Sequence, residues 1–413
     1  MSHYLDALRR LRHDLESAGH QREFLEVVRV AGSFPTARSN RDGTPAEISV
    51  WCSNDYLGMG QHPGVLAAMR DAITASGAGA GGSRNIAGTN TWHSELEREL
   101  AELHGKDDAL LFASGYTANE GALSVLAGRI EGCLVFSDEK NHASIIDGLR
   151  HSGAEKRIFR HNDPDHLEEL VAAEDPARPK MIVTESVYSM DGDIAPLARI
   201  ADIADRYGAV TFLDEVHAVG MYGPQGAGIA ASLGLADAFT VVMGTLAKGF
   251  GTTGGYIAGP ADVIDVVRGL ARSFIFTTAL PPAVVAGGLA AVRHLRRSDA
   301  ERVRLRENAT LMHRLLRERR IPFLSDESHI VSVLVGEDAT CRRISDLLLA
   351  RHGIYVQSIN APSVPVGREI LRVAPGAVHS TDGVRGFVDA LDAIWGELAQ
   401  SRSPTSRVTV STS

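Results

Sequence analysis

The sequence has few lysines, few cysteines and no long apolar run. Only five of its 42 basic residues are lysines, and only three residues are cysteines. The cysteines, at 52, 133 and 341, are far apart and show no spacing typical of metal ligands. With no signal-peptide pattern, we expect reduced thiols, no metal site and a cytoplasmic location. No apolar run approaches the roughly 20 residues that a membrane-spanning helix needs, which argues against a membrane protein.

An excess of positive charge is also absent. The 51 acidic residues outnumber the 42 basic ones, and the formal net charge is -9. Nucleic acid is therefore a disfavoured partner, because no basic surface is available to attract its backbone. The 413 residues suffice for two packed cores or one large domain with satellites. A content of 44% hydrophobic and 23% charged residues is typical of an ordinary soluble globular protein.

The apolar pattern predicts an α/β fold. Leucines spaced by three and four in the first 20 residues indicate an amphipathic helical arm. From residue 109 onward, short apolar runs alternate with helical segments, which predicts a mostly parallel, doubly wound sheet. We expect its strands at 109–112, 133–136, 181–184, 210–213 and 241–243.

A second, smaller α/β domain is expected toward the C-terminus. An Arg-rich helical stretch at about 284–320 precedes short strands near 330–335 and 354–356 and a helix at about 384–397. The predicted units are an N-terminal arm and segment (1–57), a large domain (58–285), a small domain (286–399) and a disordered tail (400–413).

Polar side chains follow the ends of the predicted strands. Doubly wound sheets bind ligands beyond the carboxyl ends of their strands, so these side chains are candidate functional residues. Strand by strand they are Gly115 and Tyr116, Asp138 and His142, Glu185 and Ser189, Asp214 and His217, and Thr245 and Lys248. Five such strand ends are much less expected by chance than any single one.

Lys248 is the most informative of them. It follows an apolar run, on a loop that Gly249 and Gly251 leave open, where an amine is well placed to form a Schiff base. The other four lysines lie in charged stretches or at the start of a strand. Taken alone, Lys248 could equally be a solvated lysine that follows a strand and has no catalytic role.

Asp214 and the start of the helix at 115 predict two parts of a cofactor site. A carboxylate at a strand end would keep a ring nitrogen protonated, as pyridoxal phosphate requires of its site, although a helix cap or metal ligand is the rival. Free N–H groups of Gly115 and Tyr116 would bind a phosphate. The Gly-rich segment 77–82 does not follow a strand in a βαβ unit, so it predicts a loop near a substrate rather than a dinucleotide site.

His142 and Arg372 are further candidates, each with a structural rival. An imidazole after a strand is suited to stack on a cofactor ring or to move a proton, but a lone histidine is as often structural. Arg372 lies in the apolar run 369–373, where a guanidinium needs an anionic partner. That partner is either an amino-acid carboxylate held by two hydrogen bonds or a structural salt bridge.

Three motifs resemble the α-oxoamine synthase family of fold-type I pyridoxal-phosphate enzymes. They are Ser-Asn-Asp-Tyr-Leu-Gly at 53–58, Asp-Glu-Val-His at 214–217 and Gly-Thr-Leu-Ala-Lys at 244–248. Within that family the 5-aminolevulinate synthases are the most similar group, on segments that include 84–86, 185–192, 328–331 and 359–365. The resemblance spans about residues 5–397. It implies a decarboxylating condensation of glycine with succinyl-CoA in a homodimer.

The resemblance also implies a role for each candidate residue. Lys248 would carry the cofactor and take the glycine α-proton, His142 would stack on the ring, and Asp214 would pair with the ring nitrogen. The remaining cofactor contacts would be Gly115, Tyr116, Ser189, His217 and Thr245, with Thr277 and Thr278 supplied by the other subunit. Glycine would be held by Asn54 and Arg372, CoA by Ser137 and Lys156, and the succinyl carboxylate by Arg22 and Asn85.

Three residues depart from the family pattern. Ser83 and Ser363 stand near the acyl chain where threonine is usual, and Ser332 stands where proline is usual. Each lost methyl removes roughly 1 kcal/mol of packing at most, which permits a broader acyl pocket without indicating another reaction. Because Arg22 and Asn85 are kept, succinyl-CoA is the predicted substrate. The rivals are an α-oxoamine synthase with another acyl-CoA and a catalytically silent binding protein on the same fold.

Overall fold

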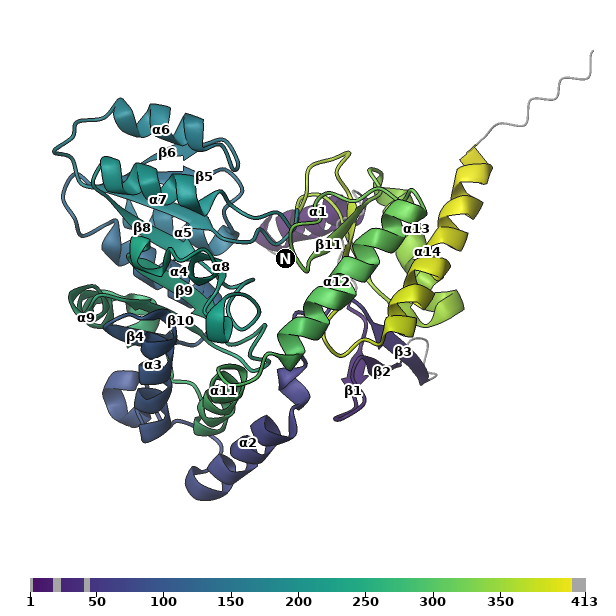
Figure 1. The fold of residues 1–413 in the computed structure, drawn as a ribbon, viewed down its shortest axis with the longest axis horizontal. Helices are drawn as coiled ribbons and strands as arrows, with labels where there is room; N and C mark the ends of the chain where they lie inside the picture. Colours follow the sequence, from purple (N-terminus) through teal and green to yellow (C-terminus); the bar gives the residue numbers. More distant parts are fainter. Residues whose placement is uncertain (1–2, 18–23, 41–44, 403–413) are drawn as a thin grey trace, which may run out of the picture.

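A seven-stranded sheet forms the centre of the larger part of the molecule. The computed structural model describes residues 3–17, 24–40 and 45–402, and Figure 1 shows this sheet beside a smaller unit that contains α12 to α14. The strand order is β4-β10-β9-β8-β7-β5-β6. The strands are β4 (Asp108–Phe112), β5 (Leu134–Asp138), β6 (Glu155–Phe159), β7 (Lys180–Glu185), β8 (Ala209–Asp214), β9 (Val241–Thr245) and β10 (Gly255–Gly259).

The sheet is mostly parallel, as the sequence predicts. Strands β9, β8, β7, β5 and β6 pair in parallel, whereas β10 is antiparallel to both of its neighbours, β9 and β4. All five strands expected in this sheet are confirmed, but β6 and β10 are additional. Strand β6 is half-exposed at the edge and β10 is rich in glycine, so neither shows the apolar run typical of a buried strand.

Helices cover both faces of this sheet, which explains why most of its strands are apolar along their whole length. One face packs against α4 (Gly115–Leu126), α5 (Ala143–Ser152), α9 (Ala261–Leu270) and α10 (Arg272–Ile275). The other packs against α6 (Pro164–Ala172), α7 (Leu197–Arg206) and the short α8 (Ile229–Ser232). A third cluster of side chains joins α3 (Thr91–His104) and α11 (Pro282–Leu295) to β4 and β10, with α2 (Pro63–Ser76) packed on α11.

The smaller unit is built on the antiparallel sheet β11-β14-β13. Its core joins side chains from the sheet, from three long helices and from Trp51. The strands are β11 (Val331–Leu334), β13 (Gln357–Ile359) and β14 (Ile370–Val373), and the helices are α12 (Ala300–Glu318), α13 (Asp338–His352) and α14 (Thr381–Arg402). The Arg-rich stretch expected as one helical region is therefore two helices, α11 and α12, separated at residues 296–299.

A third sheet joins the N-terminal segment to the smaller unit. It contains β1 (Val27–Arg29), β2 (Thr36–Ser39), β3 (Ala46–Val50) and β12 (Ile354–Tyr355). The predicted strand near 354–356 thus pairs in parallel with β3 rather than with β11. This pairing fixes the segment that leads into residues 53–58 against the unit that carries Arg372.

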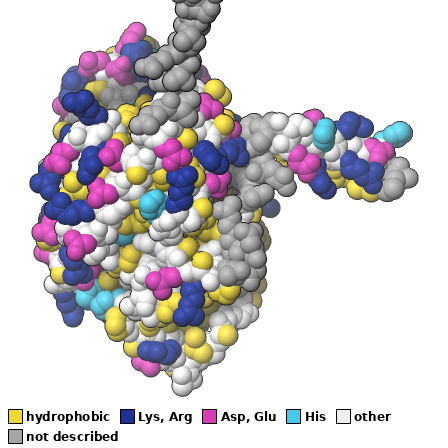
Figure 2. All heavy atoms as spheres, turned by 90° about the vertical axis from the view of Figure 1, so that its right-hand side faces the viewer, with side chains coloured by type: hydrophobic (Ala, Val, Ile, Leu, Met, Phe, Trp, Pro, Cys, Tyr) yellow, Lys and Arg dark blue, Asp and Glu magenta, His cyan; other side chains and the backbone are white. Residues whose placement is uncertain are grey.

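The first helix, α1 (His3–Ser17), projects from the body as an arm (Figure 2). The prediction of an amphipathic helix here is confirmed, and none of its residues is buried in the single chain. Leu5, Leu8, Leu11 and Leu15 are all exposed. Among the described residues no helix combines the length and apolar character needed to cross a membrane.

Candidate active site

The polar residues expected at the strand ends meet at one edge of the large sheet. Because β5, β7, β8 and β9 are parallel neighbours, their carboxyl ends lie side by side. Asp214 and Lys248 are close enough there to shift the pKa values of His142 and Glu185, and Asp214 and Glu185 in turn act on the pKa of Lys248. The convergence predicted from the sequence is therefore confirmed for these elements.

The amine of Lys248 lies in this group without a hydrogen-bond or ion-pair partner among the described residues. Burial lowers its pKa to about 8, partly opposed by the negative charge of Asp214. Two other lysines are occupied: Lys106 donates to the carbonyls of Ala236 and Phe239, and Lys180 donates to three carbonyls of residues 175–178. Lys248 is thus an amine without a partner among the described residues, and its neutral form is more accessible than that of an ordinary lysine.

Asp214 is buried at the end of β8 with no cationic side chain paired to it in the described chain. One carboxylate oxygen accepts the Val216 N–H at 2.9 Å, and the other accepts the Asn119 amide at 2.7 Å. Asn119 also donates to the Ser144 hydroxyl at 3.0 Å, and that hydroxyl lies 2.8 Å from Nδ1 of His142. A hydrogen-bonded chain therefore joins the carboxylate to the imidazole, and the sequence analysis missed Asn119.

His142 is the N-cap of α5, where its side chain accepts the Ser144 N–H. His142 is exposed, yet removal of water by neighbouring protein atoms lowers its pKa. The backbone N–H of His142 donates to the buried carboxylate of Glu185 at 2.6 Å. Burial raises the pKa of Glu185 well above its usual range, and Asp214 adds to the rise. The structural and functional interpretations of His142 are therefore compatible.

A second network lies around Tyr56, which is fully buried. Its hydroxyl lies 3.0 Å from Nδ1 of His217, donates to Asn54 at 2.9 Å and accepts from Arg372 at 3.0 Å. Burial lowers the pKa of His217 well below its usual range, and the charges of Lys248 and Arg372 lower it further. His217 is therefore a neutral imidazole whose orientation Tyr56 fixes.

Arg372 is a buried guanidinium with no carboxylate partner among the described residues. Its donors go to neutral oxygens: the Ser189 carbonyl at 2.7 Å, the Asn54 side chain at 3.1 Å and the Tyr56 hydroxyl. The structural salt bridge considered from the sequence is absent here. A buried cation bound only to neutral groups is suited to receive an anion.

The N-terminus of α4 lies beside the end of β9. Ser114 caps this helix by accepting the Thr117 N–H at 3.1 Å, and Gly115 and Tyr116 are its first two residues. Thr245, at the end of β9, lies next to Gly115: a Cβ on that glycine would meet its hydroxyl at 3.5 Å. The free N–H groups of a first helical turn are suited to bind an anion, and the phosphate role of Gly115 and Tyr116 stays a prediction.

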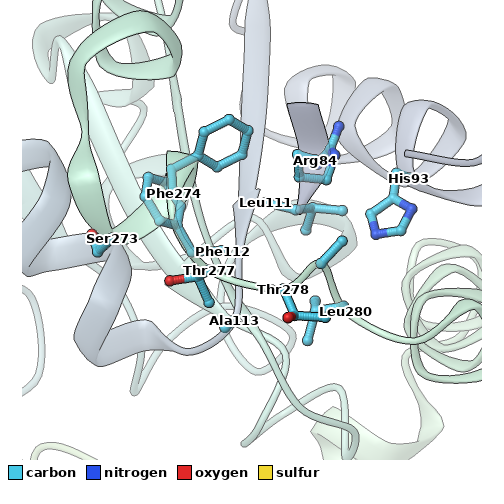
Figure 3. A pocket seen from close by; sticks show the side chains of 11 residues that line it. Arg84, His93, Leu111, Phe112, Ala113, Ser273, Phe274, Thr277, Thr278 and Leu280 are labelled. Carbon is cyan, nitrogen blue, oxygen red and sulfur yellow. The ribbon is translucent and has the colours of Figure 1, made fainter. Parts of the chain in front are cut away.

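Thr277 and Thr278 line a small pocket with Arg84 and His93 (Figure 3). Thr278 pairs with Ser83 through an isolated β-bridge, so the segment predicted to contact phosphate lies against the segment predicted to contact the acyl chain. Asn85, two residues after Ser83, is exposed. A single chain therefore brings together residues that the resemblance assigns to two ligands.

The other predicted substrate residues are spread more widely. Ser137 is buried in β5 and accepts the Asn141 amide, whereas Lys156 is exposed on the edge strand β6. Ser363 is exposed on the segment between β13 and β14. Arg22 lies outside the described residues. The structure leaves the roles of these four residues as predictions.

The residues present fit pyridoxal phosphate. Lys248 offers an unpaired amine for its aldehyde, and Asp214 offers a buried carboxylate that lacks only a cationic partner. The first turn of α4 offers N–H groups for its phosphate. These three groups have the chemistry that the aldehyde, the ring nitrogen and the phosphate of this cofactor require.

Comparison with known proteins agrees with this chemistry. Residues 46–391 match the family model described as aminotransferase class I and II. The chain is 53% identical over 391 residues to 5-aminolevulinate synthase 2 of Cereibacter sphaeroides, covering 94% of this chain and 96% of that protein. It is 54% identical over 390 residues to 5-aminolevulinate synthase of Rhizobium meliloti, with the same shares covered.

Among solved structures the chain is similar to serine palmitoyltransferases. That of S. paucimobilis, with bound pyridoxal phosphate and myriocin, superposes with a TM-score of 0.88 at 32% identity. The match covers 96% of this chain and 98% of that one. An 8-amino-7-oxononanoate synthase from Francisella tularensis shares the fold at 24% identity, with a TM-score of 0.73 over 85% of this chain and 99% of its own.

Proposed function

Since the chain belongs to the 5-aminolevulinate synthase family, within the class I and II aminotransferase family, we propose that it condenses glycine with succinyl-CoA. The products are 5-aminolevulinate, CoA and carbon dioxide, and the cofactor is pyridoxal phosphate. The observation that carries this proposal is that one site holds both a lysine amine and a buried arginine that have no anionic partner among the described residues. An amino-acid substrate needs both groups: the lysine amine near the substrate's own amine, and the arginine to bind its carboxylate.

The cofactor, when bound, supplies an electron sink that stabilises negative charge at the glycine α-carbon. Asp214, whose buried carboxylate is held by two N–H donors, would keep the ring nitrogen protonated. Gly115, Tyr116 and Thr245 hold the phosphate. Ser189 and His217 would hydrogen-bond around the phenolic oxygen, and the exposed His142 ring would stack on the cofactor.

Lys248 acts as the base in this proposal. Its Nζ takes the α-proton of glycine, and a pKa of about 8 leaves an appreciable fraction of the amine neutral at physiological pH. Arg372 and Asn54 hold the glycine carboxylate, which fixes the α-carbon relative to that amine. Lys248 or His142 returns a proton to carbon after carbon dioxide has left.

The acyl chain is assigned to residues that the resemblance singles out. Arg22 and Asn85 bind the succinyl carboxylate, Ser83 and Ser363 border the chain, and Ser137 and Lys156 contact CoA. The bridge between Ser83 and Thr278 supports a position for the acyl group next to the cofactor.

A homodimer with shared active sites and a cytoplasmic location complete the proposal. Two observations support the dimer. Thr278 and Phe276, on the segment predicted to reach the phosphate of the other subunit, are exposed in the single chain, and no residue of α1 is buried by the described part of the chain.

A panel of acyl-CoA substrates with glycine tests the function. We expect the highest kcat/KM with succinyl-CoA and a product whose mass is that of 5-aminolevulinate. Turnover with acetyl-CoA or a longer acyl-CoA, and none with succinyl-CoA, would favour another α-oxoamine synthase. A purified protein without a cofactor absorbance band would favour the catalytically silent alternative.

A further inference from the structure

His161 lies between two carboxylates. Its Nδ1 is 2.9 Å from Oδ1 of Asp138, and its Nε2 is 2.8 Å from Oδ2 of Asp193. A neutral imidazole has a single N–H and cannot donate to both acceptors, whereas the imidazolium donates from both nitrogens. The side chain is only 11% exposed, so these hydrogen bonds face little competition from water. The geometry therefore requires a charged His161.

The Asp138 end of this bridge is rigid. Asp138 ends β5, is buried, and also accepts the N–H groups of Lys140 at 2.8 Å and Asn162 at 3.0 Å. The first of these hydrogen bonds fixes the loop that leads from β5 to His142, and the second fixes the segment that follows β6. His161 is thus anchored to the edge of the large sheet at which the candidate site lies.

The Asp193 end belongs to a turn that we call the Ser189 turn, residues 189–193. Backbone hydrogen bonds between Tyr188 and Gly192 and between Tyr188 and Asp193 close this turn. Three carbonyls of this turn accept hydrogen bonds from side chains of the smaller unit. The Ser189 carbonyl accepts from Arg372 at 2.7 Å, that of Met190 from Ser332 at 2.5 Å, and that of Gly192 from Ser328 at 2.6 Å. Arg372 therefore contacts the part of the molecule that contains the large sheet through this turn.

We propose that the His161 imidazolium is a positioning residue for the amino-acid substrate, because it holds the Ser189 turn that orients the Arg372 guanidinium. His161 itself lies outside the candidate site and acts through Asp193, the turn and the Ser189 carbonyl. Ser332, which stands where the family usually has proline, adds a hydroxyl contact to the same turn. The inference deepens the proposed function and rests on it, since the ligand of Arg372 is taken to be glycine.

The charges around His161 determine how the bridge from Asp138 through His161 to Asp193 depends on pH. Asp138 and Asp193 face its two nitrogens, and Glu139 accepts its backbone N–H at 3.0 Å. On the turn, Asp191 is paired with Lys140, and the Tyr188 ring packs edge-on against the imidazole. Burial opposes the charge, but the two carboxylates outweigh it and raise the pKa of His161 to about 9. The bridge is therefore complete at neutral pH and is lost as the pH rises through about 9.

Glycine titrations of the holoenzyme, followed by cofactor absorbance, test this proposal through a dissociation constant rather than turnover. We expect His161→Gln to weaken glycine binding about five- to tenfold at pH 7.5. We compare the two proteins by the ratio of their glycine dissociation constants, variant over wild type, in which the effects of ionisations common to both proteins cancel. This ratio should fall toward one above pH 10, where His161 of the wild type has lost its charge. The exposed His151, whose ion-pair partner among the described residues is Glu120, provides the control, and His151→Gln should match the wild type throughout.

Asp193→Asn is a second variant, less prone to misfold, because an amide oxygen still accepts the hydrogen bonds of His161 and Asn162. One anionic neighbour is lost, so the alkaline weakening of glycine binding should begin at lower pH than in the wild type. A ratio near one at pH 7.5, a ratio constant across pH, or an unmoved midpoint in Asp193→Asn would each overturn the inference. A wild type that shows no absorbance change with glycine would overturn the proposed function as well.

Discussion

Three side chains of the candidate site lack the partner that their charge calls for. Within the described part of the chain, Lys248 is an unpaired amine, Asp214 a buried carboxylate without a cation, and Arg372 a buried guanidinium without an anion. Burying such groups costs free energy unless a ligand satisfies them, so together they describe a ligand with complementary charges. A cofactor with a cationic ring nitrogen and an aldehyde, together with an amino acid, fulfils all three requirements.

Lys248→Ala tests the first of these groups. We expect loss of the lysine-linked absorbance band and a fall in kcat of at least about 100-fold, since a positioned general base contributes about 10² to 10⁴ in rate. Spectra and steady-state rates of the purified variant provide the measurement. A variant that keeps the band and most of its turnover would rule out Lys248 as the attachment site.

Arg372→Lys tests the carboxylate receptor. Lysine keeps the charge but cannot make the planar set of hydrogen bonds to Ser189, Asn54 and Tyr56, so we expect KM for glycine to rise about 10- to 100-fold. KM for the acyl-CoA should change much less. The control is Arg351→Lys, at an exposed arginine paired with Glu397. Equal changes in both KM values would contradict the assignment.

The sequence predicts the charged residues of the site better than the residues that hold them. Lys248, Asp214, His142 and His217 follow strands, and that position is visible in the order of residues. Asn119 lies one turn inside α4, and its role depends on the distance to Asp214, which only the folded chain sets. Glu185 and Tyr56 lie within segments that the sequence had marked, but their partners come from elements far away along the chain.

At the scale of secondary structure, the contact between β10 and the start of α4 positions the predicted phosphate site. A Cβ on Gly255 would lie 2.5 Å from both the Gly115 Cα and the Ser114 carbonyl oxygen, so only glycine allows this approach. Sequence reasoning missed β10 because the glycines that permit the contact also remove the apolar pattern of a strand. Strands β5, β7, β8 and β9 were predictable because burial on both faces makes each a continuous apolar run.

Gly255→Ala should therefore displace the first turn of α4. We expect a loss of about 1 to 3 kcal/mol in the free energy of unfolding from overpacking, together with weaker retention of pyridoxal phosphate on dialysis. Gly269→Ala is the matched control, since a Cβ there meets nothing within 4 Å and the residue lies in α9. That variant should be unchanged or more stable by up to about 1 kcal/mol. Equal cofactor retention in both variants would contradict the role of this contact.

At the scale of the whole molecule, the candidate site lies where the large sheet meets the smaller unit. The large sheet supplies Lys248, Asp214 and His142, whereas the smaller unit supplies Arg372. The sequence predicts both units, but not that β12 pairs with β3 and so ties the N-terminal segment, with Asn54 and Tyr56, to the unit that carries Arg372. That pairing joins residues about 300 positions apart and leaves no local pattern in the chain.

Assembly is the second property at this scale. If two chains share each site, sedimentation at working concentrations should give twice the mass of one chain. Dilution that produces monomers should also release cofactor and abolish turnover, because Thr277 and Thr278 come from the other subunit in this proposal. Full activity in a demonstrated monomer would contradict the shared site.

The reaction itself is tested most directly with glycine labelled with ¹³C at its carboxyl carbon. Incubation with succinyl-CoA and the holoenzyme should release labelled carbon dioxide and give 5-aminolevulinate that carries no label, both identified by mass. A product that retains the label, or no product with succinyl-CoA when another acyl-CoA is turned over, would contradict the proposed decarboxylating condensation.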